Sequence, residues 1–452
     1  MHRIIGTMSA ALLVSLGGNG PAAQGSSIAA APPPDVTALL AAARGAPPLI
    51  CYLAARTMPG NGWGNWNDAP ATPLSSPEAR TFRDDNGPLP ASDVTALLDA
   101  MASTDPCVRE LSVRLLGGQK IAAVNDGFIA RLGSPDASMR EIAAFGLGLA
   151  EPAGAVDPLI HALRDATPGV RANAAWALGR MESGRALSSL VGLFTDDAEM
   201  VRQAAVIAAG RMDSTSSTAA LTRVLEHDSS PAVRRVAAWA LGHLESRDAA
   251  PALANALAKD ADARVREMSA WALGAIESRT AASSLSSALR TDSDDRVRET
   301  AAWALGQAGD RASVDALGAA AQSDASARVR GTAAWAIGHL DDRGVSAPPG
   351  LYKVLGDEND DVRLKAAWAL GQIGDSSALP AIRTALNKEQ NGQVRRALIR
   401  ALMKSGGRSE QIFSQLLESP DPQVREAAVR GLAGNNSFNP WPWPWPRPRP
   451  MP

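Results

Sequence analysis

A Val-Arg pair recurs along the chain at nearly constant spacing, and this repetition constrains the fold more than any other feature. Neighbouring pairs are roughly 30 to 33 residues apart, a period typical of solenoids built from repeated helix pairs. Eleven positions carry the pair, with Met replacing Val at one of them: Val108-Arg109, Met139-Arg140, Val170-Arg171, Val201-Arg202, Val233-Arg234, Val265-Arg266, Val297-Arg298, Val329-Arg330, Val362-Arg363, Val394-Arg395 and Val424-Arg425.

Each repeat contains two helical patterns. In one of them Leu253 and Leu257 lie four residues apart, and a break at 260–263 separates them from a second pattern. At 100° per residue, the apolar positions of that second pattern fall within about 80° of one another: Val265, Ser269, Ala272, Leu273 and Ile276. Neither helix buries such a stripe alone, so copies must stack. The sequence predicts an all-α, right-handed superhelical solenoid of about eleven to twelve two-helix repeats.

A Gly follows the Ala-Leu of the second helix in most repeats, inside the helical pattern, where Gly is unfavourable relative to Ala. Close approach of a neighbouring helix, which a side chain would block, is the interpretation we favour. The glycines at this position are Gly148, Gly179, Gly210, Gly242, Gly274, Gly306, Gly338 and Gly371.

The pattern D-x-x-x-x-V-R-x-x-A-A-x-A-L-G resembles the short HEAT-like repeats named after phycobilisome lyases. The resemblance runs from about Asp93 to Gly434. It implies an armadillo-type helical fold. It does not select an activity, because lyase subunits, adaptors and scaffolds share this repeat.

Five segments are expected along the chain. The motif DVTALL occurs at 35–40 and again at 93–98, which indicates a degenerate first repeat ahead of the regular ones. The predicted organisation is a signal peptide at 1–25, a degenerate N-terminal capping repeat at 26–57, a Pro/Gly/Asn-rich insertion loop at 58–91, a HEAT-like solenoid at 92–434 and a disordered tail at 435–452.

The first residues have the pattern of a signal peptide. Arg3 precedes a short apolar run, Met8–Leu16, and small residues follow, with cleavage expected after Gly25 or Ala29. The apolar run is too short to cross a bilayer, and no other stretch approaches that length. We therefore expect export to the periplasm or the extracellular space, with no transmembrane segment.

The charge balance argues against nucleic acid as a partner. The chain has 45 Lys and Arg against 47 Asp and Glu, for a net charge of −2. A protein that lies along a phosphate backbone normally has a clear basic excess. The mixed charge suits a protein or peptide partner better.

Tryptophan recurs six residues after the Val of the repeat. On a helix this position points about 140° away from the apolar stripe, so we place the indoles on the concave face lined by the second helices. Such a row is a candidate partner-binding surface, because Trp is a preferred hot-spot residue. Alternatively, each indole lies flat over the second helix of the next repeat. The row consists of Trp176, Trp239, Trp271, Trp303, Trp335 and Trp368.

An acidic residue stands five residues before the Val in most repeats. There a carboxylate caps the start of the second helix, and the Arg one turn on reaches either that Asp or the one in the neighbouring repeat. We favour a structural Asp–Arg ladder over an anion-binding strip. Its acidic members are Asp165, Asp196, Asp228, Asp260, Asp292, Asp324 and Asp357.

The end of the sequence alternates Pro with Trp or Arg. Prolines at alternate positions exclude a helix, so a polyproline II conformation is expected. The tail is a candidate contact for a groove in a partner or for a lipid interface, with a passive low-complexity tail as the alternative. Its contact residues are Trp441, Trp443, Trp445, Arg447 and Arg449.

Two cysteines, Cys51 and Cys107, occupy nearly equivalent places in adjacent repeats. Export makes a disulfide between them a candidate, with two buried thiols as the alternative.

Catalytic patterns are weak. Of the 5 His residues, His243 and His339 lie three repeats apart, too far to share a metal. The resemblance extends to deoxyhypusine hydroxylases, whose second helices carry paired His-Glu for iron, but Arg-Glu-Met or Arg-Glu-Thr stands here. We predict no catalytic residue, cofactor or metal site.

The favoured function is an exported, monomeric HEAT-repeat scaffold that binds a protein or peptide on its Trp-lined concave face. One alternative is an enzyme or enzyme subunit of the phycobilisome-lyase-like class. Another is a membrane- or envelope-associated adaptor held by its Trp/Pro/Arg tail through peripheral contact with the membrane.

Overall fold

The computed structural model describes residues 36–46, 89–340 and 347–405, with scattered residues between 414 and 429. Within these ranges every regular element is a helix, and no strand occurs. In this part of the chain, helix α1 (Val36–Ala43) precedes ten helix pairs that follow one another without interruption. The all-α repeat solenoid predicted from the Val-Arg period is therefore confirmed.

The two helices of a pair differ in length and position. The first helices are α3 (Ala91–Ala100), α5 (Ala122–Arg131), α7 (Val156–Ala162), α9 (Leu187–Gly192), α11 (Thr218–His227), α13 (Ala250–Lys259), α15 (Ala282–Thr291), α17 (Val314–Ser323), α19 (Pro349–Val354) and α21 (Leu379–Lys388). The second helices are α4 (Pro106–Gly117), α6 (Ala137–Ala150), α8 (Pro168–Arg180), α10 (Glu199–Arg211), α12 (Pro231–His243), α14 (Ala263–Ala275), α16 (Asp295–Ala308), α18 (Ala327–His339), α20 (Asp360–Ile373) and α22 (Gly392–Lys404).

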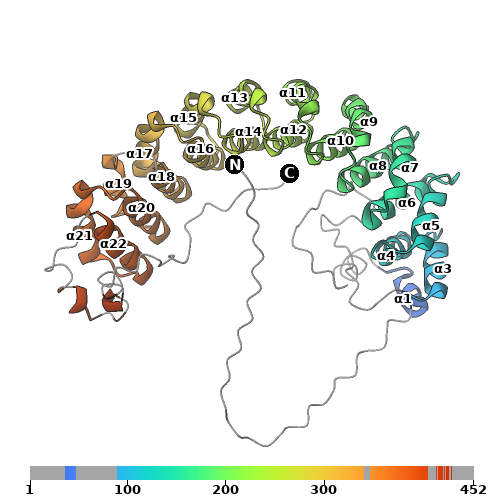
Figure 1. Cartoon of the computed structure of the whole chain (residues 1–452), viewed down its shortest axis with the longest axis horizontal. Helices are drawn as coiled ribbons and strands as arrows, with labels where there is room; N and C mark the ends of the chain where they lie inside the picture. Colours follow the sequence, from blue (N-terminus) through green and yellow to red (C-terminus); the bar gives the residue numbers. More distant parts are fainter. Residues whose placement is uncertain are drawn as a thin grey trace, which may run out of the picture. The chain divides into compact units, whose positions relative to one another are not determined.

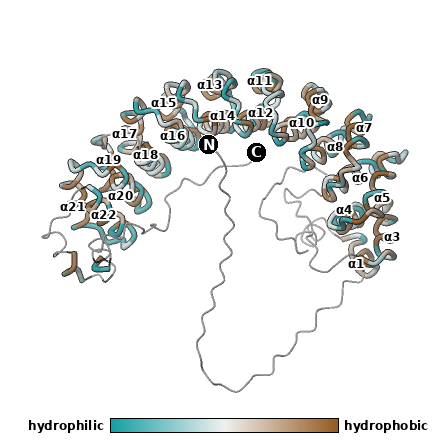
Figure 2. The backbone as a smooth tube through the Cα atoms, in the orientation of Figure 1, coloured by the Kyte–Doolittle hydropathy of each residue, from teal (hydrophilic) through white to brown (hydrophobic). Residues whose placement is uncertain are grey.

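The pairs stack into two layers. Within the solenoid the second helices form the inner, concave layer and the first helices form the outer one (Figure 1). Hydrophobic and hydrophilic residues alternate along each helix, as expected of helices with one buried side (Figure 2). The predicted position of the second helices on the concave side is thus correct.

Local sequence sets where each second helix begins and ends. At the start of α14, the Asp262 carboxylate accepts hydrogen bonds from the backbone amides of Arg264 and Val265. After the helix, Glu277 turns into the left-handed region with φ 51°, and Gly309 takes that role after α16 with φ 65°. The N-terminal cap and the left-handed residue recur in other repeats. Equivalent side chains therefore lie at equivalent positions of the inner layer.

The glycine after the Ala-Leu lies where two second helices come closest. A Cβ added to Gly242 would sit 2.8 Å from the Cα of Ala272 and 2.8 Å from Cζ3 of Trp271, both in the next repeat. A contact with backbone at that distance is relieved only by separating the helices. The close-approach interpretation is confirmed.

We expect Gly242→Ala to destabilise the solenoid by roughly 1–3 kcal/mol, as overpacking does, despite the better helix propensity of Ala. The matched control is Gly192→Ala in α9, where an added Cβ meets nothing within 4 Å. That change should be neutral or stabilise by about 0.4–1 kcal/mol. Thermal melts of the two variants check the difference, and equal melting temperatures would contradict it.

In eight of the eleven Val-Arg pairs, the Arg binds the acidic residue of the following repeat. Arg171, for example, donates from Nε and Nη2 to the two carboxylate oxygens of Asp196 at 2.8 Å each, and from Nη1 to the carbonyl of Asp165 at 2.8 Å. We call these pairs the Asp–Arg ladder: Arg140–Asp165, Arg171–Asp196, Arg202–Asp228, Arg234–Asp260, Arg266–Asp292, Arg298–Asp324, Arg330–Asp357 and, with Glu as the acid, Arg363–Glu389.

Each carboxylate also serves its own repeat. Asp196 accepts a hydrogen bond from the backbone amide of Ala198 at 2.9 Å, in the turn before α10. One residue thus fixes a turn and the junction between two repeats, while the guanidinium is fully engaged by protein groups. The structural interpretation of the ladder is confirmed over the anion-binding strip.

The ladder carboxylates make the stability of the fold depend on pH. Burial raises the pKa of Asp292, but hydrogen bonds from Arg266 and the Asp294 amide, with nearby positive charge, outweigh it, so this pKa lies below the ordinary 3.8. The pKa values of other members are lowered too: Asp165, Asp196, Asp260, Asp357 and Glu389.

A carboxylate with a lowered pKa binds its proton more weakly in the folded chain than in the unfolded one, so acid favours unfolding. We expect the free energy of unfolding to be maintained above about pH 4 and to fall steeply below it. Urea titrations at several pH values measure this. The Asp292→Asn variant, with one carboxylate fewer, should lose less stability than the parent protein as the pH falls. An equal loss in the variant and the parent would contradict the role of Asp292 in the pH dependence.

Candidate partner-binding surface

The six Trp residues of the row lie on the inner-layer helices α8, α12, α14, α16, α18 and α20. Each indole packs against the glycine of the preceding repeat. A Cβ added to Gly274 would lie 2.6 Å from Cζ3 of Trp303, and the same holds at 2.8 Å for Gly338 and Trp368. The predicted packing of indoles over a neighbouring second helix therefore exists, but toward the preceding repeat and not the next one.

The indoles are buried to different extents. Trp176 and Trp239 are each 3% exposed and Trp335 is 1% exposed, whereas Trp271, Trp303 and Trp368 are only partly buried. Three members of the row therefore act as core residues. The other three are partly exposed to solvent.

The residue one helical turn after the Trp accounts for this difference. The guanidinium of Arg180 lies 5.4 Å from the ring centroid of Trp176. His243 stacks on Trp239 with centroids 5.1 Å apart and an interplanar angle of 13°. The third covered indole follows the same rule, since His339 stacks on Trp335 at 4.9 Å and 16°.

In the partly exposed cases the same position holds a residue that does not stack: Ala275 after Trp271, Gln307 after Trp303 and Gln372 after Trp368. Trp368 stacks on Trp335 at 6.4 Å, whereas Trp271 and Trp303 make no ring stack with a described aromatic residue. It was not predicted from the sequence that Arg180, His243 and His339 cover the indoles, although the four-residue spacing carries that information.

Trp271 and Trp303 lie on the adjacent helices α14 and α16, and each is partly exposed without a stacked side chain one turn on. We call Trp271, Ala275, Trp303 and Gln307 the indole surface. It is bordered by Glu267 and Glu299, which precede the two Trp by one helical turn on the same face.

The acidic border is held by a neighbouring arginine. Arg328, half-exposed at the start of α18, lies 3.7 Å from the Glu299 carboxylate and donates to Asp295 at 2.7 Å. Glu267 is buried beside the helix start. Aromatic faces next to carboxylates form an environment that favours cationic and proline-containing ligands.

Both ends of the inner face differ from this centre. At the N-terminal end the Trp position holds Phe145 and Arg114, with Phe145 stacked on Trp176 at 5.2 Å and the Arg114 guanidinium 5.4 Å from the Phe145 ring. At the other end α22 presents Arg396, Arg400 and Lys404 at four-residue spacing, and burial lowers the pKa of Arg400. The open aromatic patch is therefore confined to the middle of the solenoid.

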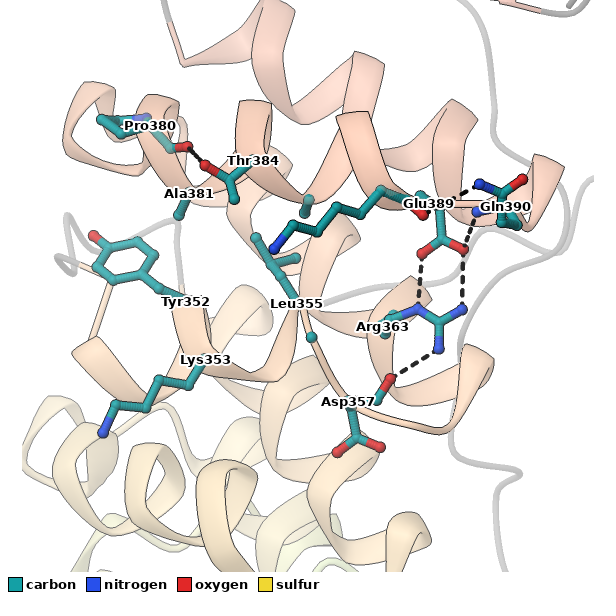
Figure 3. Close-up of a pocket in the computed structure, with 13 residues that line it drawn as sticks. Tyr352, Lys353, Leu355, Asp357, Arg363, Pro380, Ala381, Thr384, Glu389 and Gln390 are labelled. Carbon is teal, nitrogen blue, oxygen red and sulfur yellow. Dashed lines mark hydrogen bonds and ion pairs between the residues drawn. The ribbon is translucent and has the colours of Figure 1, made fainter.

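A groove of about 690 Å³ lies in the outer layer between α19 and α21. Tyr352 and Lys353 flank it, and the Arg363–Glu389 pair of the ladder closes one side (Figure 3). An equivalent groove of about 590 Å³ between α13 and α15 includes Arg266. The same kind of groove thus occurs at two equivalent places between first helices, which indicates that it arises from the stacking geometry and not from a dedicated site.

Several predicted features fall outside the described residues. These are the signal peptide at 1–25, residues 58–88 of the insertion predicted at 58–91, the tail residues 441–449 and Cys51. Cys107 is buried at the start of α4 and is disulfide-bonded. Its pairing with Cys51 stays a prediction.

Neither a metal-binding cluster nor a membrane-spanning helix occurs among the described residues. These residues contain no group of three or more His, Cys, Asp or Glu that is able to hold a metal ion. No helix among them has the length and apolar character needed to cross a membrane.

The fold defines an all-α repeat solenoid, and family comparison makes the class specific. A model of HEAT repeats matches residues 125–210, 218–306, 282–348 and 348–433. These matches cover more than half of the chain, which therefore belongs to the HEAT-repeat family. No protein of curated function matches its sequence.

Solved structures agree on the fold. Yeast importin-beta (Kap95p) is 16% identical with a TM-score of 0.51, and importin beta in an ammonium sulfate condition is 15% identical with a TM-score of 0.53. In both, the match covers 75% of this chain and 57% of the other. The CpcE–CpcF phycocyanin lyase from Nostoc sp. PCC7120 is 21% identical over 58% of this chain and 97% of that one, with a TM-score of 0.33. At these identities the likeness concerns the fold alone.

Proposed function

We propose that this chain is an exported, monomeric interaction scaffold that binds a protein or peptide partner on the indole surface of α14 and α16. The observation that carries the proposal is the partial exposure of Trp271 and Trp303, at a position that a stacked side chain covers in three other repeats. Trp is enriched in binding hot spots because it buries a large area at small entropic cost.

The class of fold supports a protein partner. HEAT solenoids offer an extended concave face, and the structure of Kap95p with RanGDP is described as one in which Kap95p binding changes the switch loops of its partner. For this chain, the acidic border at Glu267 and Glu299 favours a segment that combines basic and apolar or proline residues.

Site-specific photocrosslinking tests the surface. A benzophenone amino acid placed at Gln307, on the indole surface, should capture a defined protein from the exported fraction, whereas the same group at Arg290, exposed on α15 of the outer layer, should not. The captured protein is then purified and titrated against Trp271→Ala/Trp303→Ala. Loss of two hot spots should weaken binding at least about 30-fold. Equal capture at both positions would rule out the indole surface as the site.

Export is a separate part of the proposal and rests on the first 25 residues of the sequence. Mass spectrometry of the protein expressed from its full reading frame should find a mature N-terminus after Gly25 or Ala29. An intact N-terminus on protein that stays in the cytoplasm would contradict export while leaving the indole surface untouched.

A further inference from the structure

We propose that the C-terminal segment Trp441–Pro450 is a ligand for the indole surface of its own chain. The inference rests on the binding surface of the proposed function and names an occupant for it. Four observations support it: the period of the segment, its chemistry, the charge of the surface and the length of chain that joins the two.

The period of the segment fits that of the surface. A polyproline II helix has three residues per turn and rises about 3.1 Å per residue, so equivalent side chains repeat every ~9 Å. Neighbouring helices pack about 8–10 Å apart. In the sequence WPWPWPRPRP, every third residue gives one row of Trp443, Pro446 and Arg449, and another of Trp441, Pro444 and Arg447. Each row therefore offers one residue to each successive second helix.

The chemistry of these rows complements the surface. Proline rings pack on exposed aromatic faces, which is how aromatic-lined grooves recognise polyproline II segments. Here the faces belong to Trp271 and Trp303, partly exposed on α14 and α16. With a proline on one indole, the arginine of the same row lies one repeat further along.

Charge favours the same arrangement. The segment carries two arginines and no acid, and its target is bordered by the carboxylates of Glu267 and Glu299, of which Glu299 also faces Arg328 at 3.7 Å. The basic face of α22, with Arg396, Arg400 and Lys404, would repel it. The middle of the solenoid is therefore favoured over its C-terminal end.

The connecting chain is long enough. The helix of the last partly described repeat, which includes Val429, lies four stacking steps beyond α16, or about 32–40 Å. About 12 residues separate Val429 from Trp441, and an extended chain of that length spans roughly 40 Å. Because the ligand is tethered, its effective concentration at the surface is high, and an external partner must displace it.

Fluorescence anisotropy with a labelled synthetic peptide of residues 437–452 tests the inference. The receptor is the full chain with Trp441, Trp443 and Trp445 changed to Ala, which removes the competing tail. We expect saturable binding to this receptor and at least 10-fold weaker binding to the unaltered chain, whose own tail occupies the site.

Two further receptors locate the site. Adding Glu267→Gln and Glu299→Gln should weaken the peptide severalfold without removing any core side chain, and adding Trp271→Ala and Trp303→Ala should abolish binding. Adding Tyr352→Ala, in the outer groove, should change nothing. A peptide with Arg447→Ala and Arg449→Ala should lose its sensitivity to the Glu substitutions.

Some outcomes would overturn the inference. These are no binding to the tail-substituted receptor, equal binding to all receptors, or binding of the peptide only to vesicles of anionic lipid. A dimer formed by the unaltered chain and lost in the tail variant would overturn the intramolecular arrangement. Crosslinking from Gln307 to an external protein remains interpretable in each case, so failure of the tail inference is distinguishable from failure of the proposed function.

Discussion

Replacing Arg266 by Ala should destabilise the middle of the solenoid by about 3 kcal/mol. Arg266 donates from Nε and Nη2 to the two carboxylate oxygens of Asp292 at 2.8 and 2.9 Å. From Nη1 it donates to the backbone carbonyls of Asp260 and Ala261 at 3.0 and 3.2 Å. The substitution removes all four hydrogen bonds, which join two repeats and close the turn before α14.

The loss of stability is large because the Asp292 carboxylate remains after its cationic partner is removed. Its side chain is 8% exposed, so a carboxylate without its cation is left in a largely dry position. Removing one partner of such a pair costs more than the pair contributes, since the remaining charge is uncompensated. Arg266→Lys, which keeps the charge but not the paired donors, should give an intermediate loss.

Urea unfolding followed by hydrogen exchange measures the effect, and exchange shows whether opening begins at the junction of α14 and α16. Arg290→Ala, an exposed arginine one repeat away and outside the ladder, is the matched control and should stay within about 0.5 kcal/mol of the parent. Combining Arg266→Ala with Asp292→Ala should recover part of the loss, because the stranded charge is gone. A loss no larger than that of the Arg290 control would show that the ladder is not a main source of junction stability.

The ladder also shows how far the sequence determines the fold. The spacing of Asp and Arg placed both side chains at the start of the second helix. It did not decide whether Arg171 meets Asp165 or Asp196, because in most repeats one acid precedes the Arg and another follows it, each at a nearly constant spacing. That choice depends on the rotation between stacked repeats, a tertiary quantity that no single repeat encodes. The structure assigns the Arg side chain to the carboxylate of the next repeat and its Nη1 to the backbone of its own.

The glycine position was predictable for the opposite reason. A Gly inside a strongly helical pattern is locally unfavourable, so its recurrence at one position points to a packing requirement. The structure supplies the contact, with Gly242 against Ala272.

Predicting the exposure of the indoles requires both the helical projection and the contacts of each ring with its neighbouring side chains. A helical projection assigns all six indoles to one face, and Trp271 and Trp239 are identical in that projection. They differ because His243 stacks on Trp239, while Ala275 leaves the corresponding ring of Trp271 uncovered. The projection treats each position alone, whereas exposure of a large flat side chain depends on its neighbour one turn away.

Covering the two open indoles should strongly weaken partner binding without removing either Trp. We expect Ala275→His with Gln307→His to convert Trp271 and Trp303 to the covered arrangement, since His243 and His339 stack on their indoles at 5.1 and 4.9 Å from the same position. Indole rings stacked in this way lose contact with water. Quenching of Trp fluorescence by acrylamide should fall, and the emission should shift to shorter wavelength.

The affinity for the captured partner should fall at least about 30-fold in this variant, the loss expected when two hot-spot side chains become inaccessible. Gln372→His is the matched control, because it makes the same change beside Trp368, outside the indole surface. It should reduce quenching of one indole and leave partner affinity unchanged. If the double variant becomes resistant to quenching yet binds its partner as tightly as the parent chain, the two rings do not form the contact, and the binding function must be assigned to another part of the solenoid.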